Sequence, residues 1–585
     1  MKMNQAAQAA HLTAGQRILR YIPLWETLRN YRRSDIRKDL VAALTVAVVA
    51  IPQSMAYAVI AGVNPAYGLY TAIISTMIAS AFGSSSHLIA GPTNAISLLI
   101  ASNMKSYLGM DNFMEILFLL TFLTGALQIV FAVLRLGRAL NYVSHAVVVG
   151  FTAAAGILIA LGQLNQLLGI SIPNSASLTT LEKMGYVFTH LGKTNPYALG
   201  IGVFTMAVIL IFRRIHRSLP GSLIGMILSV IMVVALALES KGVRLTGEIP
   251  ASLPVFQLIR LDMGLAKGLF GKALAIAIIG LVEAISIAKS IASTSCQKID
   301  ANQEFIGQGL ANAAGSFFQC FAGSGSFTRS AVNYISGAAT RISGILSGIF
   351  VALTLLLLGG YARYIPMASL AGVIMVIAYG MVNRKEIKKV HTVGRSDAIV
   401  MWATFGGTLL LPDLDTAIYL GVILSIGLYL RDTNKVPVKI LLPSGETGVN
   451  FEEVEVSTVN EPVDVMIIQI EGSLYFGSAE DLESKLESLR DKSRVFILRM
   501  KRVQTIDITS LDALKTFIGR VKAAGGTVFL CGVSAGLNSI LINSELAGEI
   551  GADHIFLSEG TLLASSRKAL EKAREVARDN ACRMA

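Results

Sequence analysis

Cysteine is scarce in this chain of 585 residues, which contains four cysteines. They are Cys296, Cys320, Cys531 and Cys582, and no two of them form a C-x-x-C pair. This number and spacing indicate neither a disulfide scaffold nor a zinc site. We therefore expect packing roles for the cysteines, and no bound metal or other cofactor.

Charged residues are also scarce, at 15% of the chain, whereas 53% of the residues are hydrophobic and the mean hydropathy is +0.61. A soluble globular protein of this length does not have such a composition. The net charge of +12 comes from basic residues in short segments between apolar runs. That distribution is typical of the loops of a polytopic membrane protein and does not indicate nucleic-acid binding.

The first 38 residues lack the apolar segment that a cleaved signal peptide needs. They contain a series of basic side chains instead: Arg17, Arg20, Arg29, Arg32, Arg33, Arg37 and Lys38. We interpret residues 1–38 as a cytoplasmic arm that lies on the bilayer surface.

Residues 39–431 contain the apolar runs and form the predicted transmembrane domain. The runs lie near 40–61, 68–84, 93–104, 113–134, 143–161, 196–212, 221–239, 268–288, 304–320, 327–338, 343–359, 367–381, 397–411 and 416–430. Counted from a cytoplasmic N-terminus, these fourteen runs place both chain ends and the basic loops in the cytoplasm. We expect a multi-pass protein of the plasma membrane, which is the inner membrane if the source is a Gram-negative bacterium.

Two of the runs, 93–104 and 327–338, are shorter than the roughly twenty residues that a full crossing needs. Each follows a glycine-rich approach, and the two occupy corresponding positions in two halves of seven runs each. An odd number of runs per half inverts the second half relative to the first. Paired short helices in inverted repeats indicate a transporter site, and two facing helix N-termini favour an anion. Arg329, in the second short run, strengthens this interpretation because an intramembrane arginine is costly.

Several separated motifs stand out in this order: Leu44 to Ala47, Ile51 to Ala58, Pro65 to Tyr70, Gly91 to Thr93 and Phe327 to Tyr334. Together they resemble the SulP (sulfate permease) family of anion transporters. The resemblance covers nearly the whole chain. It implies about 14 spans as a 7+7 inverted repeat, a core domain that moves against a gate domain, a cytoplasmic STAS domain, and a homodimer.

The resemblance also implies the positions that line the substrate site, where amide and hydroxyl groups can donate to an oxyanion. They are Gln53, Tyr57, Thr93, Asn94, Phe327, Thr328 and Arg329. Polar residues on transmembrane helices can instead connect helices. Glu283, in the eighth run, has two interpretations: a carrier of the coupling proton, or a permanent ion-pair partner of Arg329.

The motifs are most similar to those of sulfate transporters coupled to protons, so we expect sulfate uptake by alternating access. Bicarbonate or dicarboxylate transport, coupled to protons or sodium, and anion exchange are the alternatives within the family. A nucleobase carrier is disfavoured by Arg329, and a membrane-tethered STAS regulator by the two short helices. An enzyme is not expected, because the chain shows no nucleophile and base pair, and Gly323 to Thr328 lack the lysine of a P-loop.

The region after Arg431 has the pattern of a soluble α/β domain. We predict a linker at 432–460, a STAS domain at 461–577 and a tail at 578–585. Expected strands are 463–470, 495–498 and 528–530, and expected helices are 478–489, 510–524, 534–545 and 560–577. Thr509 occupies the phosphoacceptor position of related domains, but together with Asp507 it could simply form and cap a turn. A cytoplasmic protein could bind this domain.

Overall fold

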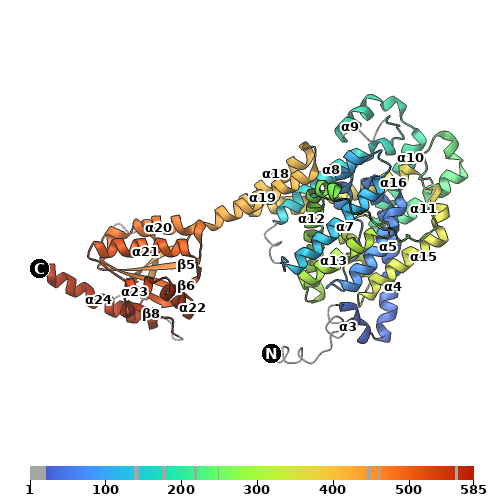
Figure 1. The fold of residues 1–585 in the computed structure, drawn as a ribbon. Helices are drawn as coiled ribbons and strands as arrows, with labels where there is room; N and C mark the ends of the chain where they lie inside the picture. Colours follow the sequence, from blue (N-terminus) through green and yellow to red (C-terminus); the bar gives the residue numbers. More distant parts are fainter. Residues whose placement is uncertain are drawn as a thin grey trace. The chain divides into compact units, whose positions relative to one another are not determined.

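The computed structural model describes residues 22–137, 144–173, 180–215, 220–247, 250–444, 450–458, 461–559 and 564–584. The chain divides into two compact units, Met1–Ile426 and Gly427–Ala585 (Figure 1). The first unit contains helices and one very short sheet, and the second contains a six-stranded sheet with helices. Arg17 and Arg20 of the predicted arm lie outside the described residues.

Each of the fourteen predicted apolar runs contains one helix. The first half has α4 (Arg33–Ala61), α5 (Pro65–Phe82), α6 (Asn94–Met104), α7 (Phe113–Val133), α8 (His145–Leu167), α10 (Pro196–Ile215) and α11 (Gly221–Ala235). The second half has α12 (Met263–Ser295), α13 (Ala301–Ser316), α14 (Phe327–Ile335), α15 (Ile342–Leu358), α16 (Met367–Met381), α18 (Arg395–Leu410) and α19 (Leu414–Thr433). Nine helices among the described residues are long and apolar enough to cross a membrane. The two short runs give α6 and α14, of 11 and 9 residues, which cannot span a bilayer by themselves.

Three further helices of the first unit lie outside the apolar runs: α3 (Pro23–Arg29), α9 (Thr180–Thr189) and α17 (Arg384–Val393). No helix was predicted for the segment of α17, which lies between two apolar runs. Its side chains are polar on one face and apolar on the other, and Asn383 caps its first turn by accepting hydrogen bonds from Lys385 N and Glu386 N.

The helices pack in two groups. The core group contains α4 to α7 and α12 to α15, in which α13 packs on α7 and α5, and α15 packs on α4 and α5. The gate group contains α8, α10, α11, α16 and α18, in which α16 and α18 pack on α8. Small residues permit the close contacts: a Cβ on Gly125 of α7 would lie 2.3 Å from the backbone nitrogen of Ala313 on α13.

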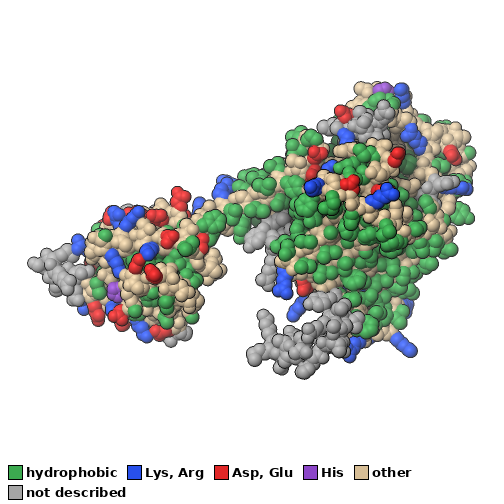
Figure 2. All heavy atoms as spheres, viewed as in Figure 1, with side chains coloured by type: hydrophobic (Ala, Val, Ile, Leu, Met, Phe, Trp, Pro, Cys, Tyr) green, Lys and Arg blue, Asp and Glu red, His purple; other side chains and the backbone are tan. Residues whose placement is uncertain are grey.

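Large hydrophobic side chains cover much of the outer surface of the first unit (Figure 2). Ile231 on α11 is 57% exposed and Leu357 on α15 is 74% exposed. A water-exposed surface with this many apolar side chains would be unusual, whereas lipid solvates it well. The first unit is therefore a multi-pass membrane domain.

The second unit is built on a sheet with strand order β4-β3-β5-β6-β7-β8. The strands are β3 (Val438–Ser444), β4 (Asn450–Glu455), β5 (Val465–Leu474), β6 (Val495–Ile506), β7 (Thr527–Val533) and β8 (Ile555–Leu557). Strands β5 to β8 are parallel, and β3 pairs antiparallel with both β4 and β5. The predicted strands correspond to β5, β6 and β7, whereas β3, β4 and β8 were not expected.

Helices cover both faces of this sheet. One face carries α20 (Ala479–Glu487), α21 (Ile508–Ala523), α22 (Ala535–Asn543) and α23 (Leu546–Ile550), and the other carries α24 (Ala564–Met584). Phe517 of α21 and Phe529 of β7 are fully buried on the two opposite faces. The expected α/β domain is thus present, with α23 as an additional short helix and α24 extending past residue 577.

Candidate functional site

Two short strands place the starts of α6 and α14 side by side. Strand β1 (Ala90–Gly91) precedes α6, strand β2 (Ser324–Gly325) precedes α14, and the two pair antiparallel with Ala90 opposite Gly325. The first N–H groups of a helix have no partner within the helix. The pairing therefore brings two helix N-termini, each with a partial positive charge, to one place in the core group.

Helices α5 and α13, the second helix of each half, hold these two strands. On α5, Thr76 donates its hydroxyl to the carbonyl oxygen of Ala90 at 2.7 Å. On α13, Asn312 accepts from the backbone nitrogen of Gly323 at 2.9 Å and donates to its carbonyl oxygen at 3.1 Å. The segments that precede α6 and α14 are thus held by corresponding helices of the two halves. Both helices use buried polar side chains for these hydrogen bonds.

Arg329 lies in the first turn of α14 and is fully buried. Its Nη2 donates a hydrogen bond to the carbonyl oxygen of Pro92 at 2.7 Å, across the junction between the two halves. Its Nε and Nη1 have no hydrogen-bond partner among the described residues. A buried guanidinium with unused donors is energetically costly unless an anion binds it.

Gly91 makes room for this guanidinium. A Cβ at position 91 would lie 2.8 Å from Nη1 of Arg329, closer than nonbonded atoms can approach. The backbone at Gly91 also has a φ of +132°, which disfavours any other residue. The backbone conformation at position 91 therefore favours glycine, and a Cβ there would displace the end of the Arg329 side chain.

Glu283 of α12 lies beside the start of α6, where the hydroxyl of Thr93 donates to its Oε2 at 3.2 Å. Among the described residues, Pro92 is the hydrogen-bond partner of the Arg329 guanidinium, and Glu283 is not. The described residues therefore show no direct hydrogen bond between the two charges, and both interpretations of Glu283 stay predictions.

The other predicted site residues differ in their exposure. Gln53 and Tyr57, on α4, are buried, and Oε1 of Gln53 has no partner among the described residues. Asn94 is half-buried and its side chain accepts a hydrogen bond from Ala95 N at 2.9 Å. Phe327 and Thr328 are exposed. Helix α4 packs against both α6 and α14, so all of these residues lie on helices that meet around the two helix starts.

The chemistry of this arrangement is that of anion binding. One guanidinium and two helix N-termini supply positive charge, and hydroxyl and amide groups supply further donors. No group of three or more potential metal ligands occurs in the described part of the chain. The arrangement around the two helix starts therefore suits an oxyanion.

Comparison with known families agrees with this geometry. The model of the sulfate permease family matches residues 36–404, and the model of the STAS domain matches residues 457–562. The chain belongs to the sulfate permease family. Its membrane domain and its C-terminal α/β domain are the two parts that the sequence motifs predicted.

Individual relatives cover nearly the whole permease. The "Putative sulfate transporter YvdB" of Bacillus subtilis is 32% identical over 90% of this chain and 97% of its own length. "Sulfate transporter 4.1, chloroplastic" of Arabidopsis thaliana is 28% identical over 92% of this chain and 81% of its own length. The solved structure of SLC26A9 has the same fold, with a TM-score of 0.86 at 19% identity over 99% of this chain and 96% of that chain.

Three contributors to the permease site were not singled out from the sequence. They are the carbonyl of Pro92, which holds Arg329, and the side chains of Thr76 and Asn312, which hold the approach strands. Thr76 and Asn312 had a usable signal, since each is a polar side chain inside an apolar run, one run before a short helix. The role of the Pro92 carbonyl has no such signal, because every residue carries a carbonyl.

In the STAS domain, Asp507 caps α21 by accepting a hydrogen bond from Ser510 N at 2.9 Å. The predicted turn-and-cap role of Asp507 is therefore confirmed. Thr509 lies in the first turn of α21 and is exposed. Its phosphorylation stays a prediction.

Proposed function

We propose that this permease is a secondary active transporter that carries sulfate into the cell together with protons, by alternating access of one site in the core group. The observation that carries the proposal is the buried guanidinium of Arg329, whose Nε and Nη1 lack partners between two helix N-termini. The names of the curated relatives, which are sulfate transporters, support sulfate as the anion.

A divalent anion suits the charges at the site better than a monovalent one. Arg329 supplies a full positive charge, and each helix start supplies about half of one. Sulfate would match this sum, and its tetrahedral oxygens could accept from donors on several sides. Bicarbonate and dicarboxylates are the next anions to test, since a bicarbonate transporter, BicA, shares the fold of the membrane domain with a TM-score of 0.58.

The substrate site in this proposal contains Arg329 together with Gln53, Tyr57, Thr93, Asn94, Phe327 and Thr328. The exposed first turn of α14, with Phe327 and Thr328, gives the route by which the anion approaches. Because Arg329 itself is enclosed, binding requires a small displacement around the guanidinium. The same displacement would free the core group to move against the gate group.

Glu283 is the proposed proton carrier. Its carboxylate accepts a hydrogen bond from Thr93, at the start of α6, and none from Arg329. Protonation would remove one negative charge from the site as the dianion enters. Release of the proton inside would restore that charge and help to expel the anion, which couples the two movements.

The remaining features follow the family. We place the permease in the plasma membrane, or the inner membrane of a Gram-negative bacterium, with both termini in the cytoplasm. It would act as a homodimer and not as an enzyme, and its STAS domain would bind a cytoplasmic partner.

Uptake of radiolabelled sulfate into proteoliposomes, with and without an inward proton gradient, tests the proposal. We expect the gradient to drive saturable uptake into wild-type vesicles. Glu283→Gln should keep exchange of sulfate for sulfate but lose the response to the gradient, because glutamine cannot carry a proton. Wild-type vesicles that move bicarbonate but not sulfate would overturn the substrate. A Glu283→Gln variant that still responds to the gradient would overturn the role of Glu283.

A further inference from the structure

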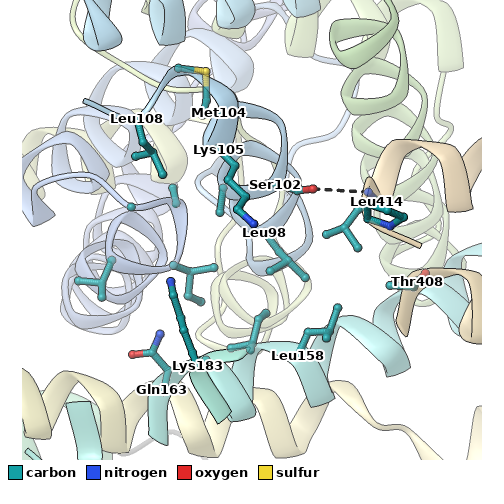
Figure 3. A pocket seen from close by; sticks show the side chains of 18 of the residues that line it. Leu98, Ser102, Met104, Lys105, Leu108, Leu158, Gln163, Lys183, Thr408 and Leu414 are labelled. Carbon is teal, nitrogen blue, oxygen red and sulfur yellow. Dashed lines mark hydrogen bonds between the residues drawn. The ribbon is translucent and has the colours of Figure 1, made fainter. Parts of the chain in front are cut away.

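A hollow of about 610 Å³ lies in the membrane unit, away from the paired helix starts. It is lined by the C-terminal ends of α4, α6, α8 and α18 and by the start of α19 (Figure 3). In the proposed orientation, with the N-terminus in the cytoplasm, all of these ends face outward. The hollow is therefore at the outer mouth.

The hollow also lies between the two helix groups. Helices α4 and α6 belong to the core group, and α8 and α18 belong to the gate group. Helix α6 leads directly from the hollow to the site, since it begins at Asn94 and ends at Met104, in the lining. An anion that enters between the groups from outside would meet this hollow first.

Two lysines line the hollow, Lys105 just after α6 and Lys183 on α9, and no Asp or Glu is among the lining residues. Figure 3 shows both side chains reaching into the same space. Neither ammonium group has a hydrogen bond or an ion pair within the described part of the chain. The pKa of Lys183 is lowered by burial and by the charge of Lys105, which is the expected effect of two ammonium groups with no carboxylate between them.

Gln163 of α8 adds an amide to the same hollow. Its side chain lines the hollow beside Lys183 and is only 8% exposed, yet its Oε1 has no hydrogen-bond partner among the described residues. A buried amide normally has its hydrogen bonds satisfied by the protein or by a ligand. Oε1 is an acceptor, which water or another donor would satisfy, whereas Nε2 of the same amide can donate to an anion that neutralises the lysines.

We infer that Lys105, Lys183 and Gln163 form an outer capture site, where the transported dianion binds before it passes to Arg329. This inference rests on the proposed function. Two ammonium groups match the charge of sulfate and its four acceptor oxygens, and the amide of Gln163 adds a neutral donor. A cleft of one charge sign raises the local concentration of an oppositely charged substrate and speeds its entry.

Initial rates of sulfate uptake into intact cells test the capture site. We expect Lys105→Gln combined with Lys183→Gln to raise the KM for external sulfate roughly tenfold, with little change in the maximal rate, and to weaken the dependence of uptake on ionic strength. Arginine at both positions should restore the wild-type KM. Lys193→Gln is the matched control, because Lys193 is an exposed lysine shortly after α9 that does not line the hollow.

A comparison of influx with efflux distinguishes a capture site on the outer side from a structural role of the two lysines. Efflux of sulfate from preloaded vesicles should keep its wild-type KM on the cytoplasmic side in the double variant. A double variant with unchanged influx, or with influx and efflux impaired alike, would overturn the capture site while leaving the sulfate transporter intact. A wild type that carries no sulfate would overturn the proposed function and the capture of sulfate together.

Discussion

The starts of α6 and α14 share one backbone design but differ in their charge. Each follows a two-residue strand, and the two strands pair with one another. The first start has neutral donors, Thr93 and Asn94, whereas the second has Arg329. The arginine of the second half is held by the carbonyl of Pro92 in the first half, so the repeats have diverged into complementary parts of one site.

The comparison also shows where each half obtains its rigidity. Asn312 makes two hydrogen bonds to Gly323 and a third to Gln128 on α7, at 2.9 Å. Thr76, in the corresponding helix, makes one bond to its approach strand. Asn312 therefore holds the segment before the charged helix through two backbone groups, whereas Thr76 holds the segment before α6 through one.

The largest expected effect comes from removing the charge of the second half. Arg329→Ala should lower the affinity for sulfate by about 3 kcal/mol, or roughly a hundredfold, because a buried charged hydrogen-bonding partner is lost. Arg329→Lys should also bind sulfate more weakly. A lysine ammonium cannot donate to the carbonyl of Pro92 and at the same time present the separate donors that a guanidinium offers to an anion. Sulfate uptake measures both. A fully active Arg329→Ala variant would show that the charge difference between the halves has no role in binding.

The next largest effect is a loss of stability on removal of Asn312 or Thr76, the side chains that hold the segments before α14 and α6. Asn312→Ala leaves both polar groups of Gly323 without their side-chain partner, at a cost of about 1–3 kcal/mol for each buried group. Thr76→Val removes one bond and keeps the shape, so it should destabilise the protein less. Thermal unfolding of the purified proteins in detergent compares the two. Equal loss of stability would contradict the asymmetry between the approaches.

A smaller effect is expected at Gly91, where the first half makes room for the arginine of the second. Gly91→Ala should weaken sulfate binding roughly tenfold, since its Cβ would displace Nη1 and its φ is strained by about 1–2 kcal/mol. Gly109→Ala is the matched control, because Gly109 also has a positive φ, +86°, but open space around its Cβ position. Equal KM values for the two variants would show that the contact between position 91 and Arg329 has no role in binding.

Much of the membrane domain could be predicted because lipid imposes a strict rule on sequence. A span must be apolar over its full length, so the fourteen runs were visible, and the two short ones stood out. Helix α17 was less visible, since its basic side chains resemble a loop. Strand β4 was missed for a related reason: it is an edge strand with Glu452, Glu453 and Glu455, which lack strand propensity.

The details of the candidate site were only partly predictable. The importance of Arg329 follows from the cost of a charge in lipid, which is a property of one residue. Its bond to Pro92 and its lack of a bond to Glu283 depend on packing between helices far apart in the sequence. The outer lysines were not singled out because a lysine near a span end is ordinary until the structure shows two of them lining one hollow.

A cryo-EM structure of the permease in saturating sulfate tests the central claim most directly. The account predicts tetrahedral density between the starts of α6 and α14, with an oxygen about 3 Å from Nε or Nη1 of Arg329. Sulfate bound elsewhere in the core group, with both nitrogens still unpartnered, would contradict it.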